Sequence, residues 1–308
     1  MSQAIVSPQR SGALAVPAFL LIAGFVLIWT SAFSVAKAAL ADCPPLLLLG
    51  GRFLLAGVLM LGAAAVSRAS WTLKRRDVVT FALLGIANQA VYLGVGYIGL
   101  LSISSGLSVL IFSCNPIITG IVATFVLDER LTWARVVGLM LGIAGVAFIV
   151  ESRLATGDDH LQGVMLTIIA TISFVAGTIV FKRYAPKNGL WIGNGIQSLA
   201  AGIALLPFSL AFESIGDIVL SWRLLWAFLY LALIVSVVAY FLWFRILTIS
   251  GATAASSYYF LMPPVGMLMG WLLLGERLEL SDLLGIIPVV LGIYLVTRPS
   301  KAGRGRTT

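Results

Sequence analysis

Long apolar stretches, separated by short polar or basic ones, follow one another along nearly the whole chain. A membrane-spanning helix needs roughly 17–25 mostly apolar residues, and about ten segments of that length are present. The connections between them are short, which leaves no room for a separate soluble domain. The expected helices lie near residues 14–37, 46–66, 78–98, 103–126, 133–150, 162–182, 190–212, 223–245, 252–274 and 283–298.

The chain repeats itself about halfway along. Pro116 recurs 147 positions later as Pro263, and the Glu-Arg-Leu turn at 129–131 recurs at 276–278. An earlier stretch repeats at an offset of 145, with Gly57 corresponding to Gly202. The repeat predicts two five-helix halves. The expected divisions are a segment 1–13, a first half 14–150, an outer connecting loop 151–161, a second half 162–298 and a basic tail 299–308.

Five is an odd number, so the second half is expected to enter the membrane upside down relative to the first. An inverted repeat provides two related conformations, one open to each side of the membrane. The sequence therefore predicts an all-α integral membrane protein of ten helices. Its two inverted halves surround a central cavity and support alternating access.

Composition agrees with a protein whose solvent is lipid. The chain is 60% hydrophobic and 10% charged, against roughly 45–50% and 25% in ordinary soluble domains. Residues 1–13 contain one Arg and precede a long apolar segment with no small-residue cleavage site, which predicts an uncleaved first helix.

Basic residues are distributed unevenly among the loops. With the amino terminus inside, 15 Lys and Arg residues fall on the cytoplasmic side and 4 on the other, with Arg52 left inside a helix. The positive-inside rule then places both termini in the cytoplasm. This bias and the basic tail account for the net charge of +8, so no nucleic-acid partner is expected.

Several short motifs carry a family resemblance. They are Trp-Thr-Ser-Ala-Phe at 29–33, Arg-Phe-Leu-Leu-Ala-Gly at 52–57, the Pro116 helix followed by 127–131, and the matching stretch 274–278. Over nearly its whole length the chain resembles EamA-type ten-helix carriers of the drug/metabolite transporter superfamily. It is most similar there to bacterial inner-membrane exporters of aromatic amino acids of the YddG type. The resemblance implies a basket-like fold, and its motifs specify the superfamily better than the substrate.

Intramembrane polar and aromatic residues are the candidates for the cavity wall, because an exposed amide in hydrocarbon is costly. For the amides, the alternative is that they join helices by hydrogen bonds. For the aromatics, it is that they fill the core or the interfacial belt. The candidates are Trp29, Thr30, Phe33, Asn88, Tyr92, Ser113, Asn115, Phe174, Tyr240, Trp243, Tyr258 and Tyr259.

Arg52 is the only basic residue well inside an expected helix. It either extends toward the interface or a helix end, or it binds a substrate carboxylate. Its repeat counterpart, Gln197, is neutral, so the halves differ chemically here.

Other chemistry has little support. No acidic residue lies in the middle of an expected helix: Glu129 and Glu276 are at helix ends, where they cap or pair with Arg, and His160 is in a loop. Proton coupling through a group at membrane depth is therefore disfavoured. The two cysteines, Cys43 and Cys114, have no metal-binding spacing. With no phosphate-binding loop and no hydrolase constellation, we expect neither an enzyme nor a cofactor or metal.

Prolines and glycines at related positions predict moving parts and close contacts. Pro116 and Pro263 each remove a backbone hydrogen bond inside a helix, and Gly24 and Gly177 lie in the first helices of the halves. We expect these four residues to act as hinges. Small residues also permit close helix packing in lipid, which is expected for Gly138, Gly142, Gly145, Gly285 and Gly292.

The expected function is secondary transport across a bacterial inner membrane. A cavity with rings, amides and hydroxyls but almost no charge favours small neutral or zwitterionic metabolites, with export of aromatic or other hydrophobic amino acids as the first hypothesis. The alternatives are nucleotide-sugars or sugar phosphates, which need several basic groups, and a passive channel, which needs pore rings. The expected partners are the lipid bilayer and a small molecule, and a monomer is favoured.

Overall fold

The computed structural model describes residues 18–67, 73–119, 133–157, 159–184, 189–243, 245, 246, 249 and 258–297. These residues form helices joined by short turns, and no strand occurs among them. The helices are α1 (Ala18–Ala39), α2 (Pro45–Val66), α3 (Arg75–Gly85), η1 (Ile86–Val91), α4 (Tyr92–Leu100), α5 (Ser105–Ser113), α7 (Trp133–Thr156), α8 (Leu161–Tyr184), α9 (Leu190–Phe212), η2 (Ile215–Asp217), α10 (Trp222–Leu229), η3 (Tyr230–Ala239), η4 (Tyr258–Leu261), α12 (Met262–Leu274) and α13 (Leu280–Thr297).

Seven of the described helical runs are long and apolar enough to cross a bilayer. The chain is therefore a multi-pass membrane protein, as its hydropathy predicted. Three shorter apolar helices fall on the expected spans 103–126, 252–274 and 283–298, parts of which lie outside the described residues. The count of ten spans thus stays a prediction. The shorter helices are Ser105–Thr119, Tyr258–Leu274 and Leu280–Val296.

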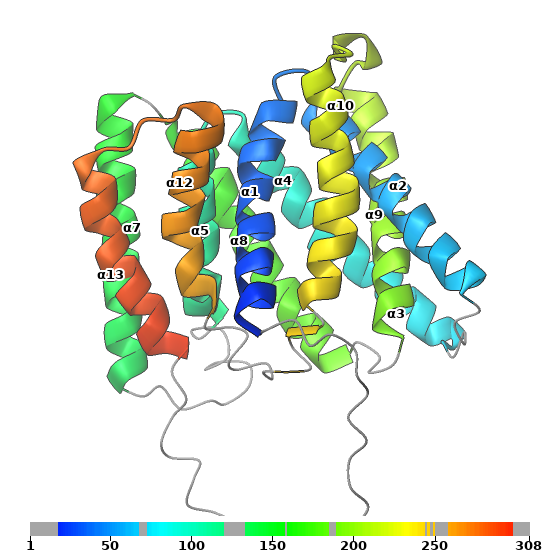
Figure 1. The fold of residues 1–308 in the computed structure, drawn as a ribbon, viewed down its shortest axis with the longest axis horizontal. Coiled ribbons are helices and arrows are strands. Elements are labelled where there is room, and N and C mark those ends of the chain that lie inside the picture. The colour runs from blue at the N-terminus through cyan, green and yellow to red at the C-terminus, as the bar shows by residue number, and fades with distance from the viewer. Residues whose placement is uncertain are drawn as a thin grey trace, which may run out of the picture.

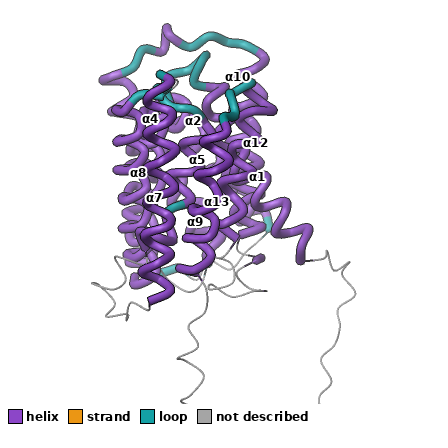
Figure 2. The backbone as a smooth tube through the Cα atoms, turned by 90° about the vertical axis from the view of Figure 1, so that its left-hand side faces the viewer, coloured by secondary structure: helices purple, strands orange, loops and turns teal. Residues whose placement is uncertain are grey.

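The helices run side by side along one axis, with most of the described turns gathered at one end (Figure 2). Helices from different halves of the chain make the main contacts: α2 packs on α9, α7 on α13 and α5 on α12. In Figure 1, α7 and α13 lie together at one side of the bundle, while α2 and α9 lie toward the other. Between them, α1 contacts both α12 and η3, and α4 contacts α8.

Glycines allow two of these pairs to approach closely. A Cβ atom at Gly138 would lie 2.8 Å from the carbonyl oxygen of Gly292, and one at Gly145 would lie 2.8 Å from that of Gly285. At the α2–α9 contact, a Cβ at Gly57 would lie 2.7 Å from the backbone nitrogen of Leu199. Only glycine fits at such distances, so the close helix packing expected at Gly138, Gly145, Gly285 and Gly292 is confirmed, and the helices that it joins are α7 and α13.

Two segments near the middle of the bundle are π-helical, η1 and η3. In η3, the hydroxyl of Ser236 donates a hydrogen bond to the carbonyl of Leu231, five residues earlier, at 3.0 Å. A π turn holds an extra residue and so redirects the side chains around it relative to an α-helix. Both segments supply residues to the cavity described below.

α7 ends later than the sequence suggested. It continues to Thr156, into the stretch 151–161 expected as a connecting loop. Arg153, in this extra helical length, is buried against Asp282 of α13. That contact packs the last turns of α7 against the start of α13.

Candidate functional site

A cavity of about 50 Å³ lies between α1, α2, α4, α8 and the two π-helical segments η1 and η3. Water occupies about 30 Å³ in the liquid, so the cavity has room for one or two water molecules. Its walls are mostly aromatic and aliphatic, with one cation and one amide. The lining residues are Trp29, Ala32, Phe33, Arg52, Phe53, Asn88, Tyr92, Leu93, Tyr97, Phe174, Val235 and Tyr240.

Arg52 is the charged group of this cavity. Its side chain is buried, with 4% of the residue exposed. Nε donates to the Ser236 hydroxyl at 2.9 Å, and Nη1 donates to the Tyr97 hydroxyl at 2.7 Å. Among the described residues, no carboxylate pairs with Arg52, and its Cζ lies 5.3 Å from the centroid of the Phe53 ring. A buried guanidinium held by two hydroxyls and an aromatic ring still lacks a counter-anion, which is costly unless an anion joins it.

Aromatic rings enclose much of the remaining wall. The rings of Tyr92 and Phe174 have centroids 4.9 Å apart, and those of Trp29 and Tyr240 have centroids 5.6 Å apart. These separations are typical of tilted and edge-to-face aromatic pairs. Such rings offer apolar surface to a side chain and electron-rich faces to an ammonium group.

Asn88 is the amide of the cavity. It lies in η1, and its Oδ1 is buried without a hydrogen-bond partner among the described residues. The amide is placed against Gly177 of α8, where a Cβ atom would coincide with Oδ1. The neighbouring Gln89 instead donates to Oδ1 of Asn194 at 3.3 Å. An amide that joins two helices was the alternative considered for Asn88. The structure shows that arrangement at Gln89 instead.

Seven of the candidates taken from the sequence meet at this cavity: Trp29, Phe33, Arg52, Asn88, Tyr92, Phe174 and Tyr240. Trp243 and Tyr259 lie nearby but not in its wall. The ring of Trp243 stacks on Phe25 at 5.2 Å and lies edge-on to Tyr259 at 6.2 Å. Tyr258 packs at the edge of the same aromatic and aliphatic core.

Three polar candidates make hydrogen bonds within their own helices. The hydroxyl of Thr30 donates to the carbonyl of Val26 at 2.6 Å, and that of Ser113 donates to Val109 at 2.7 Å. Oδ1 of Asn115 accepts from the hydroxyl of Thr119 at 3.1 Å. A hydroxyl that bonds to the preceding turn can be buried at little cost, so these residues need no cavity.

Sequence reasoning missed both hydrogen-bond partners of Arg52. Tyr97 is an aromatic residue with a polar group in the third expected span. Ser236 lies 147 positions after Gln89, so the repeat offset relates it to a polar residue of the third expected span. Neither signal points to Arg52 without the fold.

The expected hinge residues lie at helix interruptions or in close contacts. Pro116 follows a turn at Cys114, and Pro263 is at the start of α12, directly after η4. Gly177 accommodates Asn88, whereas a Cβ at Gly24 would make an ordinary 3.9 Å contact with Leu242. Whether these positions bend is a question of motion, and it stays a prediction.

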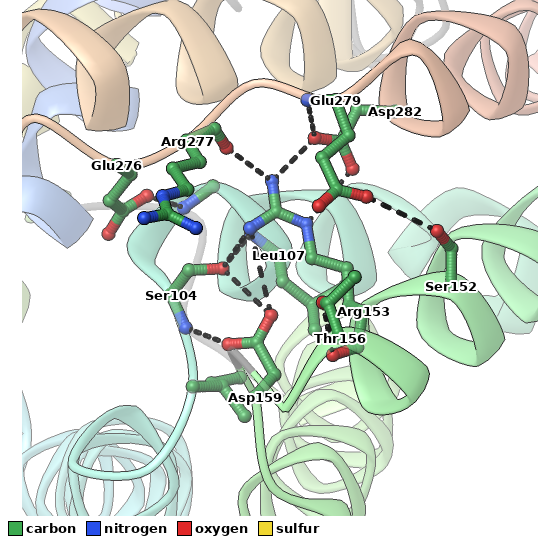
Figure 3. Close-up of polar contacts among 12 residues, drawn as sticks. Ser104, Leu107, Ser152, Arg153, Thr156, Asp159, Glu276, Arg277, Glu279 and Asp282 are labelled. Carbon is green, nitrogen blue, oxygen red and sulfur yellow. Dashed lines mark hydrogen bonds and ion pairs between the residues drawn. The ribbon is translucent and has the colours of Figure 1, made fainter.

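Charged side chains gather at the end of the bundle where α1 ends and α2 begins, which we call the ion-pair face. Arg153 donates to Asp282 from Nε at 2.9 Å and from Nη2 at 2.6 Å. Glu276 accepts hydrogen bonds from the backbone N–H groups of Ser105 at 2.6 Å and Gly106 at 3.0 Å. Figure 3 shows these groups converging from α5, α7 and the turn before α13. Of the two roles expected for Glu276, capping a helix is therefore confirmed.

Asp159 completes this cluster. Its carboxylate accepts from the backbone N–H of Ser104 and lies 3.8 Å from Nη1 of Arg153. Burial raises the pKa of Asp159 above its usual value, although both neighbours act in the opposite direction. Lys37 does not balance it directly, since Nζ donates to carbonyls, including that of Ile103 at 2.8 Å.

A second cluster extends the ion-pair face across α2, α9 and α10. Asp42 accepts hydrogen bonds from Arg223 and from the hydroxyl of Ser221, and these two donors lower the pKa of Asp42 to about 2. Glu213 caps α2 by accepting from the N–H groups of Leu46 and Leu47 at 2.8 and 2.7 Å. Within the described ranges, no group of three His, Cys, Asp or Glu side chains is placed to hold a metal ion.

The structure is an apolar helical bundle with a small, mostly aromatic cavity and with ion pairs at one end, which defines a multi-pass membrane protein. The EamA-like transporter family matches the chain twice, over residues 16–151 and 161–298. The chain belongs to this family and is a membrane transporter.

Individual relatives are similar over almost their whole length. An uncharacterized transporter, YvbV, of Bacillus subtilis is 29% identical and covers 92% of each chain. A probable amino-acid metabolite efflux pump of Salmonella typhimurium is 28% identical over 88% of this chain and 91% of its own. An S-adenosylmethionine/S-adenosylhomocysteine transporter of Chlamydia muridarum is 26% identical over 87% and 88%. One solved crystal structure shares the fold, with a TM-score of 0.67 at 18% identity over 90% of this chain and 95% of that one.

Proposed function

We propose that this transporter exports small amphipathic metabolites that carry an amino-acid group, with aromatic and other hydrophobic amino acids as the first choice. It is a ten-helix carrier of the bacterial inner membrane, works by alternating access and has both termini in the cytoplasm. The ion-pair face is its outer side, as the positive-inside rule requires.

The observation that carries the proposal is the unpaired guanidinium of Arg52 in an aromatic cavity. A carboxylate on the substrate supplies the missing negative charge, and Arg binds carboxylates in a two-point geometry. The rings beside it receive an apolar side chain and an ammonium group. A hydrophobic amino acid has all three of these parts.

Two relatives have names that fit the same chemistry. One is named for amino-acid metabolites and the other for S-adenosylmethionine and S-adenosylhomocysteine. The last two compounds also contain an α-amino acid group. A shared site for that group, with variable room for the rest of the molecule, accounts for both names.

The packing of the helices supports two inverted halves. α7 packs on α13, which is related to it by the 147-residue offset, and α2 packs on α9, which is related to it by 145. α5 packs on α12, and these two helices belong to the corresponding expected spans 103–126 and 252–274. A two-fold axis in the membrane plane brings equivalent helices of two inverted repeats into contact in this way. The three shorter apolar helices then complete ten spans.

Alternating access explains the size of the cavity. Ligand sites usually measure about 300–1,000 Å³, several times the 50 Å³ found here. A small cavity fits a state in which the two halves lie close together and the ion pairs of the ion-pair face are formed. Substrate entry requires the two halves to separate on one side or the other.

Sugar phosphates and nucleotide-sugars fit less well. They are polyanionic and favour several cations at the site, whereas Arg52 is the only Lys or Arg in the cavity wall. A passive channel requires a continuous pore with polar or charged rings, and the small cavity offers none among its lining residues.

The test is counterflow in proteoliposomes that contain the purified full-length chain. Internal unlabelled phenylalanine is expected to drive saturable uptake of labelled phenylalanine, with methionine next, threonine weaker and a sugar phosphate inactive. Arg52→Gln should abolish this uptake, and Arg52→Lys should restore only part of it because Lys lacks the planar fork. Lys74→Gln, which removes an exposed cation, is the matched control. Transport of the sugar phosphate alone, or uptake without saturation, overturns the proposal.

A further inference from the structure

The side chain of Asn88 lies between the cavity and α8. It lies in the π-helical segment η1, and π turns in otherwise α-helical spans often mark functional positions. Its side chain lines the cavity together with Arg52, so both residues are within reach of one small ligand.

Gly177 leaves room for one end of the amide. Oδ1 of Asn88 occupies the space where a side chain of residue 177 would begin, while Nδ2 is farther away, 3.2 Å from that Cβ position. Since Oδ1 is buried on α8 without a partner, the part of the amide that remains for the cavity is Nδ2. An amide nitrogen only donates hydrogen bonds.

We propose that Asn88, held by Gly177, donates a hydrogen bond from Nδ2 to the same substrate carboxylate that Arg52 binds. Asn88 is then a substrate-binding residue, and Gly177 is a positioning residue that acts through it. This inference rests on the proposed function and refines it. Arg52 and Asn88 then bind the substrate carboxylate, and the ammonium group contacts the faces of the aromatic rings.

Three phenylalanine-like probes separate these contributions. Phenylalanine has the ring, the ammonium and the carboxylate. Phenylalaninamide lacks the carboxylate, and 3-phenylpropionate lacks the ammonium. We expect the wild-type chain to bind 3-phenylpropionate more tightly than phenylalaninamide. Inhibition of phenylalanine counterflow measures this, and so does quenching of tryptophan fluorescence, because Trp29 lines the cavity.

Asn88→Asp tests the donor alone. It keeps an oxygen on Gly177 but replaces the amide nitrogen with a carboxylate oxygen, which repels a substrate carboxylate. We expect KM for phenylalanine to rise about tenfold or more, the loss typical of a hydrogen bond to a charged group. Binding of phenylalaninamide should be retained or improved. A purely structural Asn88 would instead lower the amount of folded protein and leave the order of the three probes unchanged.

Gly177→Ala tests the positioning. Its methyl group displaces Oδ1 of Asn88 and should raise KM about as much as Asn88→Ala does. The double variant Asn88→Ala, Gly177→Ala should match Asn88→Ala alone, because the oxygen that clashes is gone. Gly96→Ala is the control on the adjoining helix α4, which also packs on α8 and where a Cβ makes an ordinary 3.5 Å approach to Ala170.

The outcomes distinguish this inference from the function on which it rests. If the wild-type chain shows no saturable counterflow with any amino acid, the proposed function fails. If it does, but Asn88→Asp leaves KM and the order of the probes unchanged, the assignment of Asn88 fails alone. Additive effects in the double variant would refute the role of Gly177.

Discussion

The carboxylate of Glu276 accepts a hydrogen bond from the backbone N–H of Ser105 at 2.6 Å, which ties the α12–α13 turn to the start of α5. The residues come from different halves of the chain, so the contact must break if the halves separate on this side. Glu276→Gln keeps one acceptor oxygen and loses the charge. A hydrogen bond to a charged group contributes about 1.5–3 kcal/mol, so the variant should open on this side about tenfold more often.

A single cysteine at Ser34, in a chain without Cys43 and Cys114, measures that opening. The hydroxyl of Ser34 lies 3.0 Å from that of Ser105 and is buried. A membrane-impermeant thiol reagent added outside should label it faster in Glu276→Gln. Glu151→Gln, an exposed change on α7, should not alter the rate. Equal rates in both would mean that Glu276 does not hold this side closed.

The stability that Asp159 gives to the folded chain should depend on pH. Burial raises the pKa of Asp159 above its ordinary 3.8, so the folded chain binds this proton more tightly than the unfolded chain does. The stability gained is present at low pH and is lost as the pH rises through the raised pKa. Asp159→Asn removes this loss. In thermal unfolding, the variant should gain on the wild type as the pH is raised from about 4 to 8.

Asp42 should behave in the opposite way. Arg223 and Ser221 lower the pKa of Asp42 to about 2, so its contribution is fully present above the ordinary value of 3.8 and fades as the pH falls toward 2. Asp42→Asn should therefore destabilise the chain by a constant amount between about pH 5 and 8. A pH-dependent difference in that range would contradict this assignment.

Pro116 and Pro263 should matter for movement more than for folding. Each lies directly after a helix interruption, and the two positions correspond under the repeat. Both prolines lie in the first turn of a helix, where the ring fixes φ and the missing N–H would have no helical partner. Pro116→Ala or Pro263→Ala removes this constraint on the joint. We expect counterflow to slow several-fold while folded yield, measured by size-exclusion chromatography, stays near that of the wild type. Unchanged flux in both variants would assign the prolines to static kinks.

The α7–α13 contact should tolerate no larger side chain. Gly138→Leu forces a side chain against the backbone of Gly292, and Gly285→Leu forces one against the side chain of Ile149. Overpacking typically costs about 1–3 kcal/mol, and a clash with backbone costs more. Folded yield should fall sharply, whereas Gly62→Leu, with no neighbour within 4 Å, should be accepted. Normal yield with lost transport would place Gly138 and Gly285 on the translocation path.

The orientation can be tested at Lys74, at the start of the third span. A cysteine placed there, in a chain without its own cysteines, should react only after the membrane is made permeable, because this end of the bundle is cytoplasmic in the proposed topology. Labelling from the periplasm would overturn both the orientation and the location of the ion-pair face outside.

Hydropathy was sufficient to predict the seven long spans because lipid imposes a length and a composition on each helix. The repeated glycines also predicted close helix packing, since small residues let helices approach in lipid, but the pairing of α7 with α13 came only with the structure. Arg52 drew attention for the same reason, as a charge with no solvent.

The cavity wall was harder to predict. Thr30 and Ser113 looked like cavity residues, but each bonds to its own helix, which sequence alone does not reveal. Ser236 escaped attention because it lies in a π-helical segment, where the usual 3.6-residue period no longer tells which face a residue occupies.

The pairing of helices across the halves has a consequence for biosynthesis. When the ribosome has delivered α1 to α7 to the membrane, the principal partners of α2, α5 and α7 have not been made. Arg52 then has Tyr97 but not Ser236. The first half must therefore wait in the bilayer with only its minor helix contacts formed, until translation of α13 allows the protein to close on itself.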